Sequence, residues 1–336
     1  MDSTPAEAAA STEAQSKLIS VVLSFRNEDA VLEELIRRLE AALDPTGYDY
    51  ELIFINDASS DRSHEILLSL LESDPHLRLL NTSSRFGVVP CIYAGFERAR
   101  GDAVVTMDCD LQDPPEILPE MLAKWAAGAD VVHGTRSRRH GESFIKMLVT
   151  KWAYRVINAL ADIELPVDTG LYKVMDRRVI DHLLLIPEQD PYLRGLVAWV
   201  GFKQEHVFYE REARFAGKTH FPLISSNPIR TFAVAVMSSS RVPLATILAL
   251  GMILTSASAV VLAGMLLAAI FGSGAGLAYF AFTVLVLLGG IQLLALGVLG
   301  LYLGRVYRQT RGRPHYIIES AVGFEVATKP EDGDRA

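Results

Sequence analysis

An Asp-x-Asp-x-Gln sequence is the sharpest sign of chemistry in this chain. It places Asp108, Asp110 and Gln112 in the segment DCDLQ. In an extended segment, residues i and i+2 point to the same side, so these side chains can present oxygen atoms to one hard cation. Mg²⁺ or Mn²⁺ suits such a site, with water and a diphosphate at the remaining positions. The alternative is an acidic turn that caps a helix starting near Pro114.

Basic residues gather in two later segments. Arg136 lies in the sequence HGTRSRR, and Arg211, Arg214 and Lys218 lie in the sequence REARFAGK. Both Arg and Lys bind phosphate, and Arg can do so bidentately, so these residues are candidates for holding a phosphorylated substrate. Simple attraction to anionic lipid headgroups would use the same charges.

The elements that must position these residues alternate along the chain. Short apolar runs predict strands at 18–25, 51–55, 77–81 and 103–107, and apolar residues at helical spacing predict helices at 29–43, 61–71 and 89–99. This alternation predicts a doubly wound α/β domain with a mostly parallel sheet. Ligands of such sheets bind at the carboxyl ends of the strands.

Polar residues follow three of the predicted strands. Glu28 comes after the first strand, Asp57 after the second and Asp108 after the fourth. No glycine-rich phosphate loop follows the first strand, which counts against a dehydrogenase and a P-loop NTPase. His133 follows an apolar run, and we expect it in the core rather than in the catalytic machinery.

A long uncharged segment follows the α/β pattern. Residues 242–304 contain no Asp, Glu, Lys or Arg, and the sequence GSGAG divides them. The two pieces, about 244–270 and 277–304, are each long enough to cross a hydrocarbon core of about 30 Å, so we expect two transmembrane helices. Arginines flank both pieces on the outer sides, and the positive-inside rule places both chain ends in the cytoplasm.

Composition limits the class of protein. The chain has 336 residues, a net charge of −8 and 2 Cys. The negative charge argues against a nucleic-acid partner, and two cysteines exclude a disulfide-rich module. We expect disordered tails at 1–17 and 321–336, a catalytic domain at 18–220, juxtamembrane interfacial helices at 221–243, the two transmembrane helices within 244–304 and a basic cytoplasmic segment with a short strand at 305–320.

Taken in order, these motifs resemble the family 2 glycosyltransferases with the GT-A fold. The resemblance rests on SVVLSFRNE, ELIFINDASSD and ARGDAVVTMDCDLQDPPE, and it covers about residues 18–320. It points to the polyprenyl-phosphate branch, which includes dolichol-phosphate mannose synthase, and the two spans are similar to bacterial enzymes that glucosylate undecaprenyl phosphate. The sequence Asn56-Asp57-Ala58 departs from the commoner Asp-Asp-Gly.

This resemblance implies a reaction at the inner membrane. A hexose, with UDP-glucose as the expected donor, passes from a nucleotide sugar to polyprenyl phosphate on the cytoplasmic leaflet, with inversion and with Mg²⁺ or Mn²⁺ as cofactor. A GDP-mannose-dependent mannosyltransferase and an enzyme acting on another membrane lipid are the alternatives. The expected partners are the nucleotide sugar, the lipid phosphate and the bilayer, and the spacing Gly300-x-x-x-Gly304 leaves self-association open.

The resemblance also implies roles for single residues. Glu28 and Asp57 match residues that hold the nucleoside of the donor, and the metal and diphosphate site matches Asp108, Asp110 and Gln112. Residues near the reacting centre match Asp110, Arg136 and Asp168. The acceptor phosphate is assigned to Arg211, Arg214 and Lys218. The role of Asp168 stays open between orienting the acceptor, binding metal, taking a proton and capping a turn.

Overall fold

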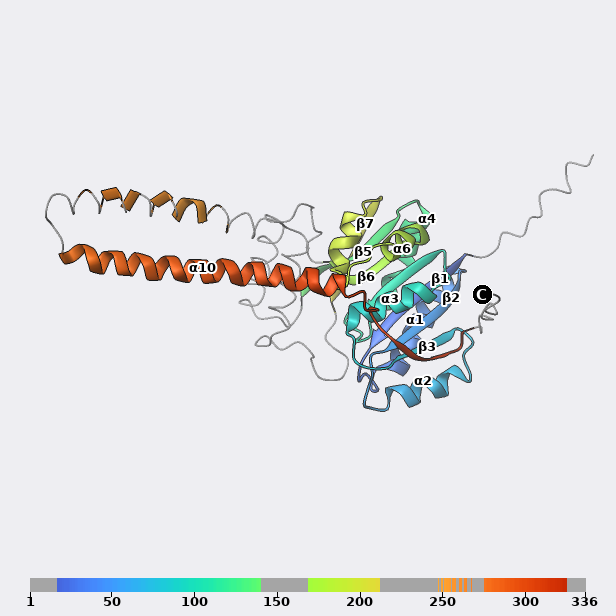
Figure 1. Ribbon diagram of the computed structural model, residues 1–336. Helices are drawn as coiled ribbons and strands as arrows, with labels where there is room; N and C mark the ends of the chain where they lie inside the picture. Colours follow the sequence, from blue (N-terminus) through green and yellow to red (C-terminus); the bar gives the residue numbers. More distant parts are fainter. Residues whose placement is uncertain are drawn as a thin grey trace, which may run out of the picture.

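The computed structural model describes residues 17–139, 169–211 and 275–324, with scattered positions between 247 and 267. These residues form an eight-stranded sheet with the order β7-β5-β6-β4-β1-β2-β3-β8 (Figure 1). Strands β6 and β8 run antiparallel to their neighbours, and the other strands share one direction. The mostly parallel α/β sheet predicted from the sequence is therefore confirmed.

The predicted strands appear with small shifts. The sheet contains β1 (Leu18–Phe25), β2 (Asp49–Asn56), β3 (Leu77–Thr82), β4 (Ala103–Asp108), β5 (Val131–Arg139), β6 (Thr169–Asp176), β7 (Gln204–Arg211) and β8 (Ile318–Val322). The central strands are continuous apolar runs because both faces of the sheet are covered. The short strand expected within 305–320 is β8, which runs two residues further because it pairs with β3 and forms the edge of the sheet.

Helices cover both faces of the sheet. They are α1 (Leu32–Leu43), α2 (Ser63–Leu71), α3 (Val88–Arg98), α4 (Leu118–Ala126), α6 (Arg177–Leu184) and α7 (Leu193–Trp199), with short 3₁₀ turns η1 (Asp44–Thr46) and η2 (Pro115–Ile117). A further helix, α10 (Ala275–Thr310), does not cover the sheet. The helix predicted from residue 29 starts at 32, because the amide of Val31 closes a turn onto the carbonyl of Glu28. The one predicted from residue 61 starts at 63.

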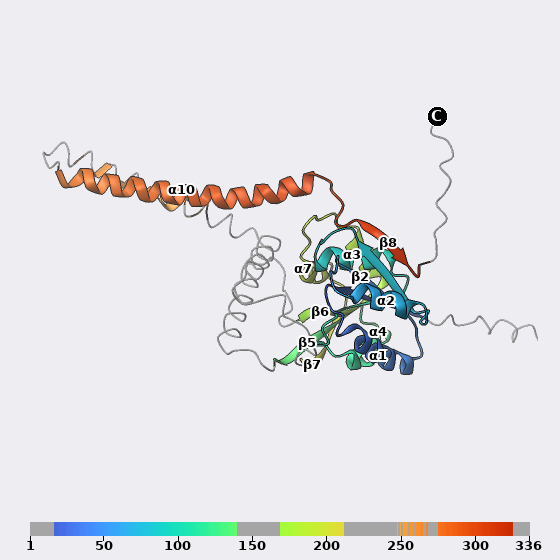
Figure 2. The same cartoon turned by 90° about the horizontal axis from the view of Figure 1, so that it is seen from below.

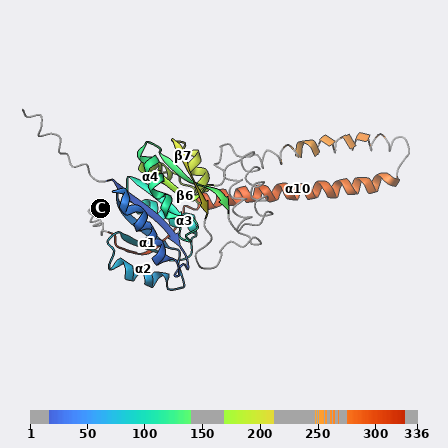
Figure 3. The same ribbon diagram turned by 180° about the vertical axis from the view of Figure 1, so that it is seen from behind.

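Two apolar cores lie on opposite faces of the sheet. One contains Leu39 of α1, Leu67 of α2 and Met121 of α4, packed against the strands, and Figure 3 shows α1 lying along its side of the sheet. The other contains Phe96 of α3 and Val179 of α6, together with part of α7. Burial of these side chains is the main force that holds the three layers together.

Helix α10 leaves the α/β domain as a single long helix (Figure 2). Its part Phe280–Thr310 has 31 residues and a mean hydropathy of 2.5, and it alone among the described helices is long and apolar enough to cross a membrane. It covers the second predicted span. The first span lies largely outside the described residues, as do the interfacial helices expected at 221–243.

Candidate active site

The carboxyl ends of the central strands lie at one level of the sheet. Phe25 at the end of β1 pairs with Asn56 at the end of β2, and Ser24 pairs with Asp108 at the end of β4. The loops after these strands therefore leave the sheet side by side. This arrangement brings Glu28, Asp57, Asp108 and Asp110 to one edge, as the sequence predicted.

Each of these three loops contains a left-handed residue that is not glycine. Asn27 has φ 55°, Ala58 has φ 51° and Leu111 has φ 54°. This conformation costs an L-residue about 1 kcal/mol, and for Ala and Leu no local hydrogen bond of the side chain repays it. Such strain gathers at functional sites, where the surrounding structure holds it in place.

The loops after β1 and β2, residues 26–29 and 57–63, interlock; we call them the β1–β2 loops. Arg26 donates from Nη1 to the carbonyl oxygens of Asp57 at 2.7 Å and Ala58 at 2.9 Å. The amide of Ser60 donates to Oδ1 of Asn27 at 2.8 Å, and the amide of Asn27 donates to the hydroxyl of Ser59. Many short bonds thus fix this side of the edge.

Asp57 ties these loops to the start of α3. Its buried carboxylate accepts hydrogen bonds from the backbone amides of Phe86 at 2.7 Å and Gly87 at 3.1 Å. Glu28 is also buried, and its amide donates to the hydroxyl of Ser63. The two residues predicted to hold the nucleoside therefore lie at the same edge, next to the amino end of a helix.

Asn56 has a structural role in this arrangement. It is buried, its Nδ2 donates to Oδ1 of Asn81 at 3.0 Å and its Oδ1 accepts from the amide of Ser59 at 2.8 Å. A neutral amide can make both bonds at once, whereas a carboxylate could only accept. This explains why the chain tolerates Asn at this position.

Asp108 and Asp110 form an acidic pair at the end of β4. Burial, the charges of Asp113 and Asp110, and an opposing effect of Arg136 and Arg194 together raise the pKa of Asp108 to about 6. Crowded carboxylates of this kind are relieved by a divalent cation. Asp110 is buried, and its Oδ1 accepts from the amide of Gln112 at 3.2 Å.

The donor set fits Mg²⁺ or Mn²⁺ that is shared with a phosphate ligand. Across the described ranges, no group of three or more His, Cys, Asp or Glu residues is arranged to hold a metal ion. The chain thus offers Asp108, Asp110 and the amide oxygen of Gln112, and the other positions fall to water and substrate. Cys109 faces the other way, with its sulfur directed at the carbonyl oxygen of Ser24.

A second cluster, which we call the Asp113 cluster, consists of Asp113, Arg136, Tyr209 and Arg211. Asp113 is 0% exposed. Both of its oxygens lie 3.1 Å from Nη2 of Arg136, and the Tyr209 hydroxyl donates to Oδ1 at 2.5 Å. The Arg211 Nε is 3.8 Å away, which is an ion pair without a hydrogen bond.

Electrostatics keep Arg136 and Tyr209 in the forms that donate hydrogen bonds. Burial lowers the pKa of Arg136, but the charges of Asp113 and Tyr209 and the hydrogen bonds to both together outweigh this effect, and the net shift is upward. Burial and the charge of Asp113 raise the pKa of Tyr209, so its hydroxyl stays protonated and donates. The arginine is therefore a permanent cation beside the acidic pair.

The local backbone makes room for Arg136. A β-bulge between Arg136 and Arg138 shifts the register of β5 against β7. Bulges re-aim side chains near active sites. A Cβ atom on Gly170 of β6 would lie 2.9 Å from Nη2 of Arg136, so only glycine leaves the guanidinium in its present place.

Three polar side chains of β5, β6 and β7 form a hydrogen-bonded row, which consists of His133, Lys173 and Gln204. His133 is 0% exposed, as expected for a core residue. Gln204 donates from Nε2 to two backbone carbonyls, so its Oε1 must accept from Nε2 of His133 at 2.7 Å. Nδ1 of His133 then accepts from the Lys173 amine at 2.6 Å. Burial, followed by the charge of Lys173, lowers the pKa of His133 to about 3.

The predicted site residues are thus only partly assembled in the described structure. It brings Arg136 and Arg211 together at Asp113, and Arg136 is near enough to Asp108 to affect its pKa. Asp168, Arg214 and Lys218 lie outside the described residues. Sequence reasoning missed Asp113, although a third acidic residue directly after Gln112 and before two prolines was a signal that could have found it.

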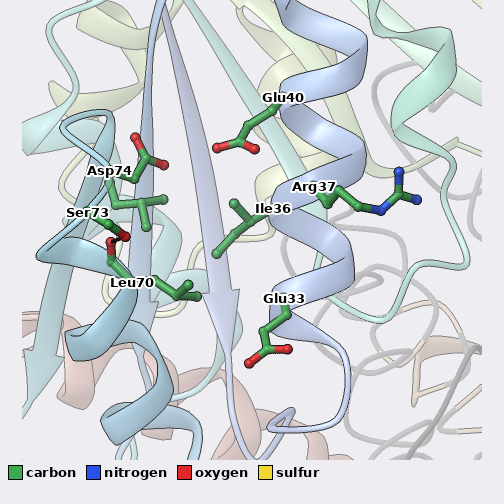
Figure 4. Close-up of a pocket in the computed structure, with 8 residues that line it drawn as sticks. Glu33, Ile36, Arg37, Glu40, Leu70, Ser73 and Asp74 are labelled. Carbon is green, nitrogen blue, oxygen red and sulfur yellow. Dashed lines mark hydrogen bonds between the residues drawn. The ribbon is translucent and has the colours of Figure 1, made fainter.

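A surface hollow of about 310 Å³ lies elsewhere, between α1 and α2 (Figure 4). Its lining residues are Glu33, Ile36, Arg37, Glu40, Leu70, Ser73, Asp74 and Leu77. None of the candidate residues takes part. The hollow is therefore separate from the candidate active site.

The chain is similar to several known glycosyltransferases. The model of the family "Glycosyl transferase family 2" matches residues 20–184. The "Uncharacterized glycosyltransferase YkcC" of Bacillus subtilis is 39% identical over 91% of this chain and 94% of its own length. The "Bactoprenol glucosyl transferase" of Shigella phage SfX is 33% identical over 90% of this chain and 99% of its own length.

A solved structure shows a more distant likeness. Glucosyl-3-phosphoglycerate synthase from Mycobacterium tuberculosis, in complex with Mn²⁺, uridine-diphosphate and phosphoglyceric acid, aligns with a TM-score of 0.46 and 21% identity. The alignment covers 66% of this chain and 76% of that chain.

Proposed function

This chain belongs to glycosyl transferase family 2, and from that premise we propose that it transfers a hexose from a nucleotide sugar to polyprenyl phosphate. The single observation that carries the proposal is the acidic pair Asp108 and Asp110 beside a cluster that presents two arginines. The likeness to a bactoprenol glucosyl transferase over 90% of the chain supports the lipid acceptor and favours UDP-glucose as donor.

In this proposal the acidic side of the edge holds the nucleotide sugar. Asp57 and Glu28, buried beside the start of α3, bind the nucleoside. Asp108, Asp110 and Gln112 hold a divalent cation that neutralises charge on the diphosphate as it leaves. Burial and the neighbouring carboxylates of Asp113 and Asp110, which raise the pKa of Asp108, are the physical reason to expect a cation at this place.

The basic side of the edge binds phosphate. Arg136 and Arg211 are presented there by Asp113, and Arg214 and Lys218 follow Arg211 in sequence. An oxygen of the lipid phosphate attacks the anomeric carbon, the bond from that carbon to the diphosphate breaks, and the configuration inverts. The acceptor is already largely ionised at neutral pH, so positioning and charge neutralisation dominate, with Asp168 orienting the acceptor.

We infer that α10 holds this edge beside a bilayer. The helix carries no charged residue from Phe280 to Gly304, and Arg305 and Arg308 lie at the end that contacts the α/β domain. With the first span of 244–270, it would form a hairpin whose two ends lie in the cytoplasm. The acceptor phosphate then reaches the enzyme from the cytoplasmic leaflet of the inner membrane.

A transfer assay tests the proposal. The full chain, purified in detergent, is mixed with undecaprenyl phosphate, Mg²⁺ or Mn²⁺, and labelled UDP-glucose or GDP-mannose in parallel. We expect label from UDP-glucose in the organic phase and none after EDTA. Label from GDP-mannose alone would replace the donor, and no label from either would contradict the proposed reaction. Diacylglycerol as a parallel acceptor tests a lipid without phosphate.

A further inference from the structure

Asp113 differs from the acidic pair in its partners. It is fully buried, and among the described residues its carboxylate has hydrogen bonds or ion pairs with Arg136, Tyr209 and Arg211. These partners belong to β5 and β7, whereas Asp113 follows β4. One carboxylate therefore contacts both strands, in addition to their backbone pairing and to side-chain bonds such as that from Nε of Arg136 to the Tyr209 hydroxyl.

The charges of this group point outward. Two guanidinium groups face one carboxylate, so the group carries a surplus positive charge. The side chain of Asp113 is 0% exposed, that of Arg136 is 12% exposed and that of Arg211 is 22% exposed. The carboxylate is thus fully buried, and the two guanidinium groups lie nearer the solvent. An anion that approaches the Asp113 cluster would therefore meet Arg136 and Arg211 before it met Asp113.

Both arginines also keep N–H groups that can donate hydrogen bonds to such an anion. Arg136 uses Nη2 for Asp113 and Nε for the Tyr209 hydroxyl, at 3.2 Å. The buried Nε of Arg211 has no hydrogen-bond partner in the described part of the chain. Guanidinium groups bind phosphate through several N–H groups at fixed angles, so a small rotation changes the fit.

We propose that Asp113 is a positioning residue that aims Arg136 and Arg211 at a phosphate group of the substrates. It does not touch substrate itself, because the arginines lie between it and the open side. This inference rests on the proposed function and deepens it. The phosphate belongs either to the nucleoside diphosphate or to the lipid, and the two sources are separated by measurement.

The test uses two variants and one matched control. Asp113→Asn keeps the shape and removes the charge. Tyr209→Phe removes only the hydroxyl that bonds Asp113 and Arg136. Glu51→Gln is the control: Glu51 is a buried carboxylate that accepts from the Ser20 hydroxyl at 2.6 Å and pairs with Arg100 at the opposite end of the sheet.

Three quantities are measured for each purified full-length protein. They are the Kd of UDP with Mn²⁺ by calorimetric titration, the KM of undecaprenyl phosphate in the transfer assay, and the melting temperature. We expect Asp113→Asn to lower kcat/KM by about 10- to 100-fold, the range for a misplaced catalytic group. Either the Kd of UDP or the KM of the lipid should rise, and that choice identifies the phosphate.

Tyr209→Phe should move the same constant in the same direction by a smaller factor, and it carries the test if Asp113→Asn does not fold. Glu51→Gln should lower the melting temperature and leave both constants unchanged. An active wild-type enzyme whose two constants are unaffected by Asp113→Asn and Tyr209→Phe would overturn the positioning role alone. A wild-type protein that transfers no sugar would overturn the proposed function and this inference together.

Discussion

The β1–β2 loops and the Asp113 cluster, which lie on two sides of the candidate active site, are held in place by different means. The β1–β2 loops are joined by many hydrogen bonds, from backbone amides, from short neutral side chains such as those of Asn27 and Ser59, and from Arg26 to two backbone carbonyls. The Asp113 cluster depends on one buried carboxylate that holds two arginines. The first side spreads its stability over many bonds, and the second concentrates it in one group.

The difference has an energetic consequence. A neutral hydrogen bond contributes about 1 kcal/mol net, so losing one of many changes little. Removing one partner of a buried ion pair costs about 3–5 kcal/mol, because a charge is left without compensation. We therefore expect single substitutions to be tolerated in the β1–β2 loops and to be severe around Asp113.

The largest effect should come from the acidic pair that lies between the two sides. Asp110→Asn removes a charge needed by the cation and keeps the acceptor for the amide of Gln112. We expect transfer activity to fall by about 10²- to 10³-fold, the cost of losing one electrostatic stabiliser of a transition state. Labelled product in the organic phase measures it, and an unchanged rate would remove Asp110 from the metal site.

The next effect tests whether Arg136 needs its present position. Gly170→Ala places a methyl group 2.9 Å from Nη2 of Arg136 and forces the guanidinium to move. We expect activity to fall about 10-fold, because small displacements of a positioned group are costly. Gly290→Ala on α10 is the control, since its added methyl meets no atom within 4 Å. Equal activities of the two variants would refute the requirement.

The row of His133, Lys173 and Gln204 should make the stability of the folded chain sensitive to acid. His133 has its pKa lowered to about 3 in the folded chain. In the unfolded chain its pKa is about 6.5, so the unfolded state binds the proton first as pH falls. The free energy of unfolding should therefore drop between pH 6.5 and 3, by up to about 1.4 kcal/mol per pH unit.

Denaturant titrations at several pH values measure this slope. His133→Asn keeps an acceptor for Lys173 and cannot titrate, so its stability should depend less on pH in the same window. Equal slopes in the two proteins would mean that His133 does not control acid unfolding.

An Asp-to-Asn substitution in the β1–β2 loops should change the free energy of unfolding only slightly. Asp57→Asn leaves an oxygen to accept from Phe86 or Gly87 but lowers its strength as an acceptor. We expect a loss of about 1 kcal/mol in the free energy of unfolding, together with a higher KM for the nucleotide sugar. Thermal melting and donor titration measure the two effects. A loss as large as that of Asp113→Asn would break the distinction between the sides.

The two sides also differed in how far the sequence predicted them. The strands and the acidic pair follow from local patterns, since apolar runs and an i, i+2 spacing need no tertiary information. The Asp113 cluster joins residues 23 and 96 positions apart, and no local pattern relates them. The left-handed turns at Ala58 and Leu111 contradict the preference of these residue types, so only the folded environment explains them.

The smallest effect concerns the C-terminal part, which contacts both sides. On the basic side, Arg308 of α10 pairs with Asp190 at 2.7 Å, in the loop that leads to α7. On the other side, the Ser320 hydroxyl of β8 accepts from Nδ2 of Asn81 at 2.9 Å. Arg308→Gln and Ser320→Ala thus each remove one contact, ionic in the first case and neutral in the second.

Arg308 is 57% exposed, so solvent screens its pair and Arg308→Gln should cost at most about 1 kcal/mol. Its effect on the melting temperature should vanish in 1 M salt, where charges are screened within about 3 Å. The effect of Ser320→Ala should persist, because a neutral hydrogen bond is not screened in this way. Equal salt dependence in the two variants would mean that α10 is held by contacts other than this ion pair. The basic side would then be anchored to the membrane helix by packing, as the β1–β2 side is anchored by neutral bonds.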